Sequence, residues 1–285
     1  MVISPIIIVQ ILSQTLYRQH LFNYWSYQNI IRVIFLNNRF HQGFMVSNTE
    51  LIAGILTLLP LVIGYTMAII SFRIYRKGGS NLVLLTSILF FALPSPWLGV
   101  STVFIEQLLG LNVLNPTAYV FLYAWSVPII ALVWNYTSAS LIKYKDYIKY
   151  IVLAIIGILD LIFLWAIYID KQFEVNEVQG SIFLDSTFTG TASLVSTLVV
   201  ASVILFVAPL YFWIAYKTED PLFKFKARFI GLGALLFSFS AGLDASIELG
   251  SIGLVIVVRL ALVTSLILLY LGYNTPDRIK SRYQT

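Results

Sequence analysis

The chain has 285 residues, of which 59% are hydrophobic and 11% are charged, and its mean hydropathy is +0.87. Soluble domains are roughly 45–50% apolar and about 25% charged, so a water-soluble fold of this length could not cover so much apolar surface. The absence of cysteine excludes disulfides, thiolate metal sites and a cysteine nucleophile. The net charge of +5 is spread in short clusters between apolar runs, which argues against a nucleic-acid partner.

The histidines, His20 and His41, both precede the long apolar body of the chain. Imidazole is the commonest protein ligand of transition metals, so the apolar body lacks the side chains that a buried metal or haem site needs. The sequence therefore predicts no metal site and no cofactor.

Residues 1–44 form an N-terminal extension. Its apolar stretch, Pro5–Leu12, is too short to cross a bilayer, and the basic region and small-residue cleavage site of a signal peptide are missing. Two interpretations remain open. The extension is an interfacial segment anchored by side chains such as Trp25, or the working protein starts at Met45, where a short polar lead precedes the first long apolar run.

Seven apolar runs within residues 45–275 are long enough to cross a membrane. A spanning helix needs ~20 mostly apolar residues, because each residue adds about 1.5 Å toward roughly 30 Å of hydrocarbon. The runs are too long and too uniformly apolar to be the strands of a barrel. The predicted helices are Leu51–Phe72, Leu82–Phe104, Ala118–Leu141, Tyr150–Tyr168, Ala192–Tyr216, Phe229–Ile247 and Ile252–Tyr273. We expect an all-α, seven-helix transmembrane bundle in the lipid bilayer, followed by a short tail, residues 276–285.

Basic residues follow alternate helices of this set. They come after the first, third, fifth and seventh runs, at Arg73, Arg76, Lys77, Lys143, Lys145, Lys149, Lys217, Lys224, Lys226, Arg228, Arg278, Lys280 and Arg282. The other connections are acidic, with Lys171 as their one basic residue. Cytoplasmic loops carry the excess of lysine and arginine, so the pattern predicts an outer N-terminus and a cytoplasmic C-terminal tail. The expected location is the plasma membrane.

The longest outer connection, Ile169–Thr191, mixes acidic residues with apolar ones. An ordered element is expected in a connection of this length, so it predicts a short hairpin or a lid over the bundle.

Prolines interrupt four of the predicted helices, at Pro60, Pro94, Pro96, Pro128 and Pro209. Each removes a backbone hydrogen bond and bends its helix. The strongest break is Ala92-Leu93-Pro94-Ser95-Pro96-Trp97, which predicts a cavity wall or a hinge. Trp97 and Trp125 add aromatic surface in the second and third helices, where packing or interface anchoring is the commoner role for such side chains.

Ionisable residues at membrane depth are the main candidates for a functional site, because burying them is costly. Asp244 and Glu248 fall near the outer end of the sixth helix, and Arg259 falls at a similar depth in the seventh. A very short connection makes these helices antiparallel neighbours, which predicts a buried Asp244–Arg259 ion pair. The pair either locks the helices together or, with Glu248, lines an outward-facing ligand site. Asp160, in the middle of the fourth helix, is expected to be a neutral hydrogen-bond donor that joins helices or serves a proton-linked step.

Known seven-helix families differ in their match to these residues. A retinal protein needs a lysine in the last helix, and Ile252–Tyr273 has none. The layout from Leu51 to Tyr273, together with the exit segment Leu271–Lys280, resembles the seven-helix membrane regions of prokaryotic, especially archaeal, sensor proteins such as those ahead of histidine kinases. The resemblance implies ligand sensing without catalysis. No kinase module follows, so output would need a cytoplasmic signalling partner or a homo-oligomer.

A second reading is a small-solute transporter with three-plus-one-plus-three helices, which prolines in the first, second and fifth helices favour loosely. A membrane-embedded enzyme is a third possibility, because Asp160 and Asp244 could form a dyad, although their predicted depths differ. The reading that we carry forward is a sensor-like or receptor-like bundle without enzymatic activity.

Overall fold

The computed structural model describes residues 48–109, 111, 115–141, 146–177, 184–246 and 252–283. These residues belong to one compact unit, Ser47–Thr285. The predicted N-terminal extension and Glu248 lie outside the described residues. The predicted tail contains the short helix α13 (Asp277–Lys280) and the 3₁₀ turn η3 (Ser281–Tyr283).

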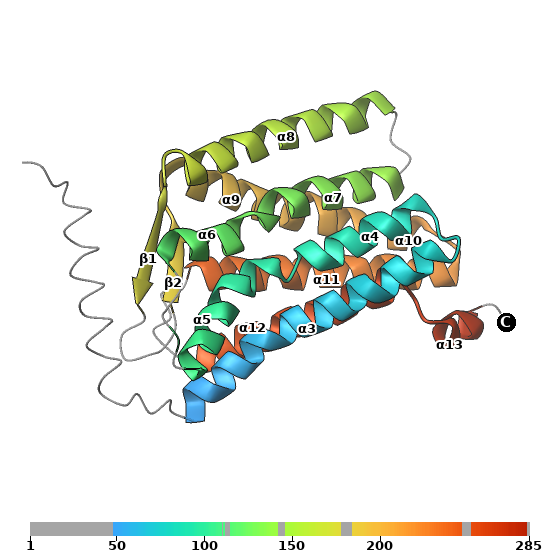
Figure 1. Ribbon diagram of the computed structural model, residues 1–285. Helices are drawn as coiled ribbons and strands as arrows, with labels where there is room; N and C mark the ends of the chain where they lie inside the picture. Colours follow the sequence, from blue (N-terminus) through green and yellow to red (C-terminus); the bar gives the residue numbers. More distant parts are fainter. Residues whose placement is uncertain are drawn as a thin grey trace, which may run out of the picture. The chain divides into compact units, whose positions relative to one another are not determined.

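Long helices make up most of the described chain (Figure 1). They are α3 (Asn48–Arg76), α4 (Asn81–Ala92), α5 (Leu98–Leu108), α6 (Pro116–Ala124), α7 (Ser126–Leu141), α8 (Asp146–Tyr168), α9 (Gly190–Ser202), α10 (Ala208–Lys217), α11 (Pro221–Ser246) and α12 (Ile252–Tyr273). A 3₁₀ turn, η1 (Ser95–Trp97), joins α4 to α5, and a π-helical turn, η2 (Val203–Val207), joins α9 to α10. Within the described residues, each predicted transmembrane run is thus mainly helical, with breaks near Pro94 and at Trp125.

Six helical stretches are long and apolar enough to cross a membrane, and each coincides with a predicted run. They are Glu50–Arg76, Asn81–Leu108, Pro116–Ser140, Tyr150–Tyr168, Gly190–Lys217 and Gly253–Tyr273. The remaining run lies in α11, a helix of 26 residues whose first turns carry Lys224, Lys226 and Arg228. The structure is mostly helical, as predicted, with one small β-sheet among the described residues, and its long apolar helices are compatible with a membrane bundle; the count of seven crossings and the orientation of the termini stay predictions.

The helices form a closed ring in which neighbours along the chain pack together. α3 packs on α4, α4 on α7, α7 on α8 and α8 on α9; α10 packs on α11, α11 on α12, and α12 returns to α3. The bundle has two ends of different character. The hairpin end carries the N-termini of α9 and α12, and the basic end carries Arg73, Arg76, Lys77, Lys217 and Lys224 (Figure 1).

Proline explains where three spanning stretches break. A proline leaves the carbonyl four residues earlier without its helical partner. Pro128 leaves the carbonyl of Ala124, the last residue of α6, without a helical donor. Pro96 does the same to the carbonyl of Ala92, the last residue of α4. Pro209 acts on Leu205, which lies within the π-helical turn η2. Pro60 lies inside α3, which continues through it as one helix.

The tightest helix contact joins α11 to α12. A Cβ on Gly233 would lie 2.9 Å from the backbone nitrogen of Leu269, and one on Gly272 would lie 2.9 Å from the backbone nitrogen of Ile230. Small residues let membrane helices approach this closely, since packing rather than water exclusion drives their association in lipid. The two glycines therefore fix the spacing of the helices that carry Asp244 and Arg259.

The longest connection between the helices, Ile169–Thr191, contains the predicted hairpin. Strand β1 (Phe173–Glu177) pairs antiparallel with β2 (Leu184–Phe188), with Phe173 opposite Phe188. Phe188 packs against Tyr123 of α6 and Phe163 of α8, with ring centroids 5.0 and 5.2 Å apart. These contacts hold the base of the hairpin against the bundle.

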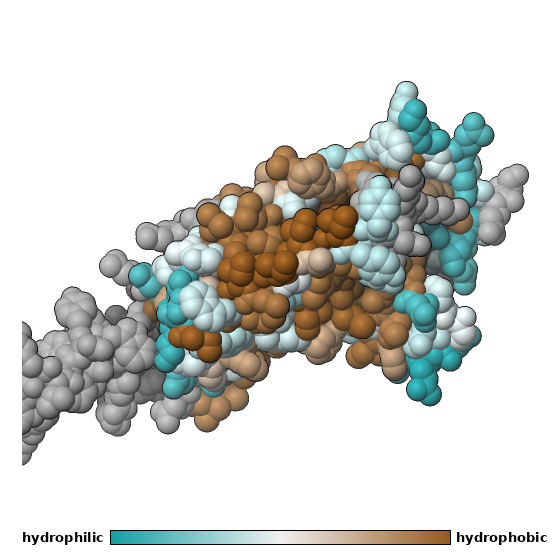
Figure 2. All heavy atoms as spheres, turned by 90° about the horizontal axis from the view of Figure 1, so that it is seen from above, coloured by the Kyte–Doolittle hydropathy of each residue, from teal (hydrophilic) through white to brown (hydrophobic). Residues whose placement is uncertain are grey.

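The surface of the bundle matches a bilayer. Figure 2 shows apolar residues gathered in a band between two polar ends. Large apolar side chains are exposed on several helices, including Ile158 and Leu161 on α8, Phe206 on η2 and Val257 on α12. Monomeric soluble proteins rarely expose contiguous apolar surface of this extent. Together with the six spanning stretches, this surface identifies a multi-pass membrane protein.

Candidate functional site

The predicted ion pair is present near the hairpin end. Arg259 Nη1 lies 2.8 Å from Asp244 Oδ2, which joins α12 to the last turns of α11. Arg259 is only 2% exposed, whereas the Asp244 side chain keeps 18% of its surface accessible. The sequence prediction of an Asp244–Arg259 pair is confirmed, and Glu248, its predicted neighbour, lies outside the described residues.

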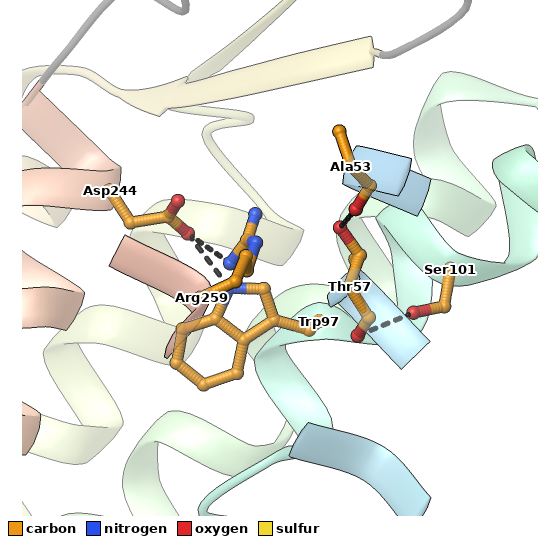
Figure 3. Close-up of polar contacts among 6 residues, drawn as sticks. All are labelled: Ala53, Thr57, Trp97, Ser101, Asp244 and Arg259. Carbon is orange, nitrogen blue, oxygen red and sulfur yellow. Dashed lines mark hydrogen bonds and ion pairs between the residues drawn. The ribbon is translucent and has the colours of Figure 1, made fainter. Parts of the chain in front are cut away.

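Trp97, from the helix break, completes this cluster. Its Nε1 donates a hydrogen bond of 2.8 Å to Asp244 Oδ2, the same oxygen that Arg259 contacts. The Arg259 guanidinium carbon also lies 5.4 Å from the centroid of the Trp97 ring, within cation–π range. Figure 3 shows both nitrogen donors converging on one carboxylate oxygen while the other oxygen points away. We call Trp97, Asp244 and Arg259 the polar triad.

The helices beside the triad are joined by backbone carbonyls. Ser101 of α5 donates a hydrogen bond of 3.4 Å to the carbonyl of Thr57 in α3, and Thr57 donates one of 2.9 Å to Ala53 (Figure 3). Thr57 and Ser101 are both fully buried. The Ser101–Thr57 bond joins α5 to α3, whereas the Thr57–Ala53 bond lies within α3.

A cavity of about 370 Å³ opens on the other side of the triad. Its walls come from η1, α6, α7, β2, α9, η2 and α11. Pro96 and Trp97 form part of one wall, as predicted for the helix break. The volume falls in the range of roughly 300–1,000 Å³ that is usual for small-molecule sites.

Aromatic and aliphatic side chains line most of this cavity. Phe237 of α11 lies between Trp97 and Trp134, with T-shaped ring contacts at 6.0 and 5.8 Å, and Tyr123 and Phe188 also reach the lining. The polar lining consists of few groups: the hydroxyls of Ser196, Thr197, Ser238 and Tyr123, the Trp97 and Trp134 indoles, and the Asp244 carboxylate. An apolar pocket with a few placed polar groups is the usual form of a ligand site.

Asp160 lies apart from the polar triad. It is 4% exposed, and its Oδ2 has no hydrogen-bond partner among the described residues. No hydrogen bond or ion pair joins it to Asp244 in the described part of the chain. The sequence grouped Asp160 with the polar residues, but the structure does not bring it into contact with them.

Two residues of the predicted hinge play packing roles. Pro94 contacts α3, where a Cβ on Gly64 would meet its Cγ at 2.6 Å. Trp125 packs on Phe91 with a centroid distance of 6.0 Å. Neither residue is in the lining of the cavity described above, so of the four predicted cavity or hinge residues Pro96 and Trp97 reach it.

A second polar network lies toward the basic end. Tyr211 of α10 and Tyr273 of α12 share a hydrogen bond of 3.3 Å, and Ser138 of α7 donates to Tyr211 at 3.5 Å. Asn274, in the exit segment of the last helix, donates a hydrogen bond of 2.6 Å to Ser71 of α3. One apolar core, which includes Trp134 and Phe237, extends from the cavity wall to Tyr211.

The sequence did not indicate Phe237, Phe188 or Ser238 as site residues. Phe237 and Ser238 lie in a helix that is apolar on most sides, so periodicity gives no sign of the face that turns inward, and Phe188 lies in the mixed connection between α8 and α9. Only the three-dimensional packing selects them. Comparison with protein-family models, curated proteins and solved structures found no match to this chain.

Proposed function

We propose that the protein is a sensor-like or receptor-like seven-helix bundle of the plasma membrane, which binds a ligand in the cavity beside the polar triad and carries out no catalysis. The observation that carries this proposal is the double role of Trp97. Its ring forms a wall of the cavity, and its indole nitrogen holds the carboxylate that joins α11 to α12. A ligand that moves Trp97 therefore alters the contact between η1, α11 and α12.

The proposal gives the signal a route to the basic end. Trp97 lies in a 3₁₀ turn between two half-helices, where a small rotation changes the direction of α4. Phe237 and Trp134 belong to the same core as Tyr211, whose network joins α7, α10 and α12. Packed cores tend to switch between discrete arrangements, so occupancy of the cavity is coupled to the cytoplasmic ends of the helices. A cytoplasmic signalling partner or a second copy of the chain then receives the change. The likeness of the helix layout to prokaryotic sensor regions supports this role.

We propose no catalysis because Asp244 is already hydrogen-bonded to two donors and Asp160 lies apart from it. Asp244 Oδ2 accepts hydrogen bonds from Arg259 and Trp97, and no bond joins Asp244 to Asp160 within the described ranges. An aspartate dyad requires two carboxyls close enough to share a proton.

Transport of a small solute is the second candidate, since broken helices are a feature of transporter sites. The breaks at η1 and at Trp125 near the cavity favour it. In a three-plus-one-plus-three arrangement, however, α11 would be the counterpart of the broken α4–α5 stretch, and α11 is continuous from Pro221 to Ser246. The sensor reading is therefore preferred.

The test fills the cavity by substitution and measures the distance between two spin labels at the basic end of the bundle. The chain has no cysteine, so Lys77→Cys and Lys217→Cys accept spin labels without background. Gly242→Leu places a side chain in the cavity, because a Cβ on Gly242 already lies 3.7 Å from Val200, another lining residue. Gly157→Leu is the matched control, since a Cβ there meets nothing within 4 Å.

If the protein is a sensor, the distribution of distances between the two labels in nanodiscs should differ between Gly242→Leu and Gly157→Leu. Val200→Phe, which fills the cavity from the opposite wall, should produce the same change. Identical distributions in all three proteins would overturn the sensor role. Accumulation of radiolabelled solutes in proteoliposomes, blocked by the filling variants, would establish the transporter instead.

A further inference from the structure

The rim of the cavity is continuous with the lipid-facing surface. Phe239 and Leu243 of α11 line the cavity, yet they are 52% and 46% exposed. On the facing side, Val200 and Ile204 of α9 and η2 are partly exposed and line it as well. These exposed side chains belong to the apolar band that contacts hydrocarbon. A molecule dissolved in the bilayer therefore reaches the cavity between α9 and α11.

The polar group of the cavity lies at one end. Asp244 is within a turn of the end of α11, near the hairpin end, whereas Phe237, Trp134 and Val203 lie about two turns deeper. The cavity is thus polar near the hairpin end and apolar further in, as a bilayer leaflet is polar at its headgroups and apolar toward its centre. A molecule with one polar end and an apolar body fits it without turning over.

The polar triad determines the chemistry of that end. Within the described residues, the hydrogen bonds to Asp244 from Trp97 and Arg259 both use Oδ2, and Oδ1 has lone pairs that can accept from a ligand donor. Arg259 neutralises the carboxylate, and therefore the site offers a hydrogen-bond acceptor without net negative charge. An anionic headgroup would meet carboxylate lone pairs and be repelled. A neutral hydroxyl can donate to Oδ1 at no cost in buried charge.

We infer that the cavity takes a neutral amphiphile dissolved in the bilayer, with an apolar body and a terminal hydroxyl, which enters between α9 and α11 and donates a hydrogen bond to Asp244. This inference rests on the proposed function, because it names the ligand class of the same cavity. The aromatic walls contact the apolar body, and the Ser238 hydroxyl provides a further polar contact along its length.

The test uses the full chain in nanodiscs with three photoreactive probes. They are a long-chain primary alcohol with a diazirine in the chain, the matched carboxylic acid and the matched hydrocarbon. After illumination, mass spectrometry locates the labelled peptides. We expect the alcohol to label lining residues of α9 and α11 about fivefold more than the acid or the hydrocarbon, the factor that one net hydrogen bond provides.

Unlabelled dodecanol should compete for these positions, Gly242→Leu and Val200→Phe should abolish the labelling, and Gly157→Leu should retain it. Equal labelling by all three probes, or labelling confined to outward faces such as that of α8, would overturn the inference. The spin-label distances test the proposed function without any ligand. A distance change in the filled variants without alcohol-selective labelling would thus reject the ligand class and leave the sensor role standing.

Discussion

Trp97 Nε1 donates a hydrogen bond of 2.8 Å to Asp244 Oδ2, between residues that are 147 positions apart in the sequence. This bond ties the broken second stretch of the bundle to the antiparallel pair α11 and α12. Two different donors, an indole and a guanidinium, thus stabilise one carboxylate oxygen. The stability of the helix pair and the position of the cavity wall therefore depend on the same atom.

Removal of one partner of the ion pair should strongly destabilise the bundle. Arg259→Ala leaves the Asp244 carboxylate without its counter-ion, and Asp244→Ala leaves a guanidinium that is 2% exposed. Breaking a buried pair in this way costs about 3–5 kcal/mol. The free energy of unfolding can be measured by titration with sodium dodecyl sulfate in mixed micelles.

The double variant Asp244→Ala/Arg259→Ala should recover part of that loss, because it leaves neither charge unpaired. Arg73→Ala, at an exposed position of the basic end, is the control and should change stability little. Strictly additive losses in the double variant would show that the two residues are not energetically coupled.

Trp97→Phe isolates the contribution of the indole nitrogen. The phenyl ring still packs against Phe237 and faces Arg259, but the hydrogen bond to Asp244 is lost. A hydrogen bond to a charged group contributes about 1.5–3 kcal/mol, so a loss of this size is expected in the free energy of unfolding. Trp125→Phe is the matched control, because its ring packs on Phe91 and lies outside the triad. An equal loss in both variants would mean that ring size, not the hydrogen bond, determines the effect.

The extent of agreement between sequence and structure has a physical reason. Length and apolarity predicted most helices within a few residues, although α11 begins eight residues before the predicted Phe229. The prolines predicted the break in Ala92–Trp97, whereas α3 continues through Pro60 as one helix. The Asp244–Arg259 pair followed from matching depth on two adjacent helices. The partner Trp97 did not, because a hydrogen bond between distant helices depends on how each helix is rotated. In helices that are apolar on all sides, the sequence holds no signal for that rotation.

Gly233 should tolerate no side chain. A Cβ there would lie 2.7 Å from Leu269 Cγ and 2.9 Å from the Leu269 backbone nitrogen, so α11 and α12 would have to separate. Overpacking of this kind costs about 1–3 kcal/mol, and we expect Gly233→Ala to lose that much stability. It should also weaken the coupling between Asp244 and Arg259, which depends on the same spacing. Gly157→Ala, in open space on α8, is the control and should gain up to about 1 kcal/mol, because alanine is the better helix former and meets no clash there. A stable Gly233→Ala protein would contradict the close approach of the two helices.

The predicted orientation places the basic end in the cytoplasm and the hairpin end outside. Because the chain has no cysteine, Lys77→Cys and Glu174→Cys each introduce one reactive thiol, and both positions are exposed. In intact cells, a membrane-impermeant maleimide should label Glu174→Cys and spare Lys77→Cys, and after permeabilisation it should label both. Equal labelling of the two thiols in intact cells would place the C-terminal ends of α3 and α8 on the same side of the membrane. In that case the connections could not alternate across the bilayer, and the bias of lysine and arginine would have another cause. The reverse pattern would keep the bundle but turn the polar triad toward the cytoplasm, where a ligand would approach it from the opposite leaflet.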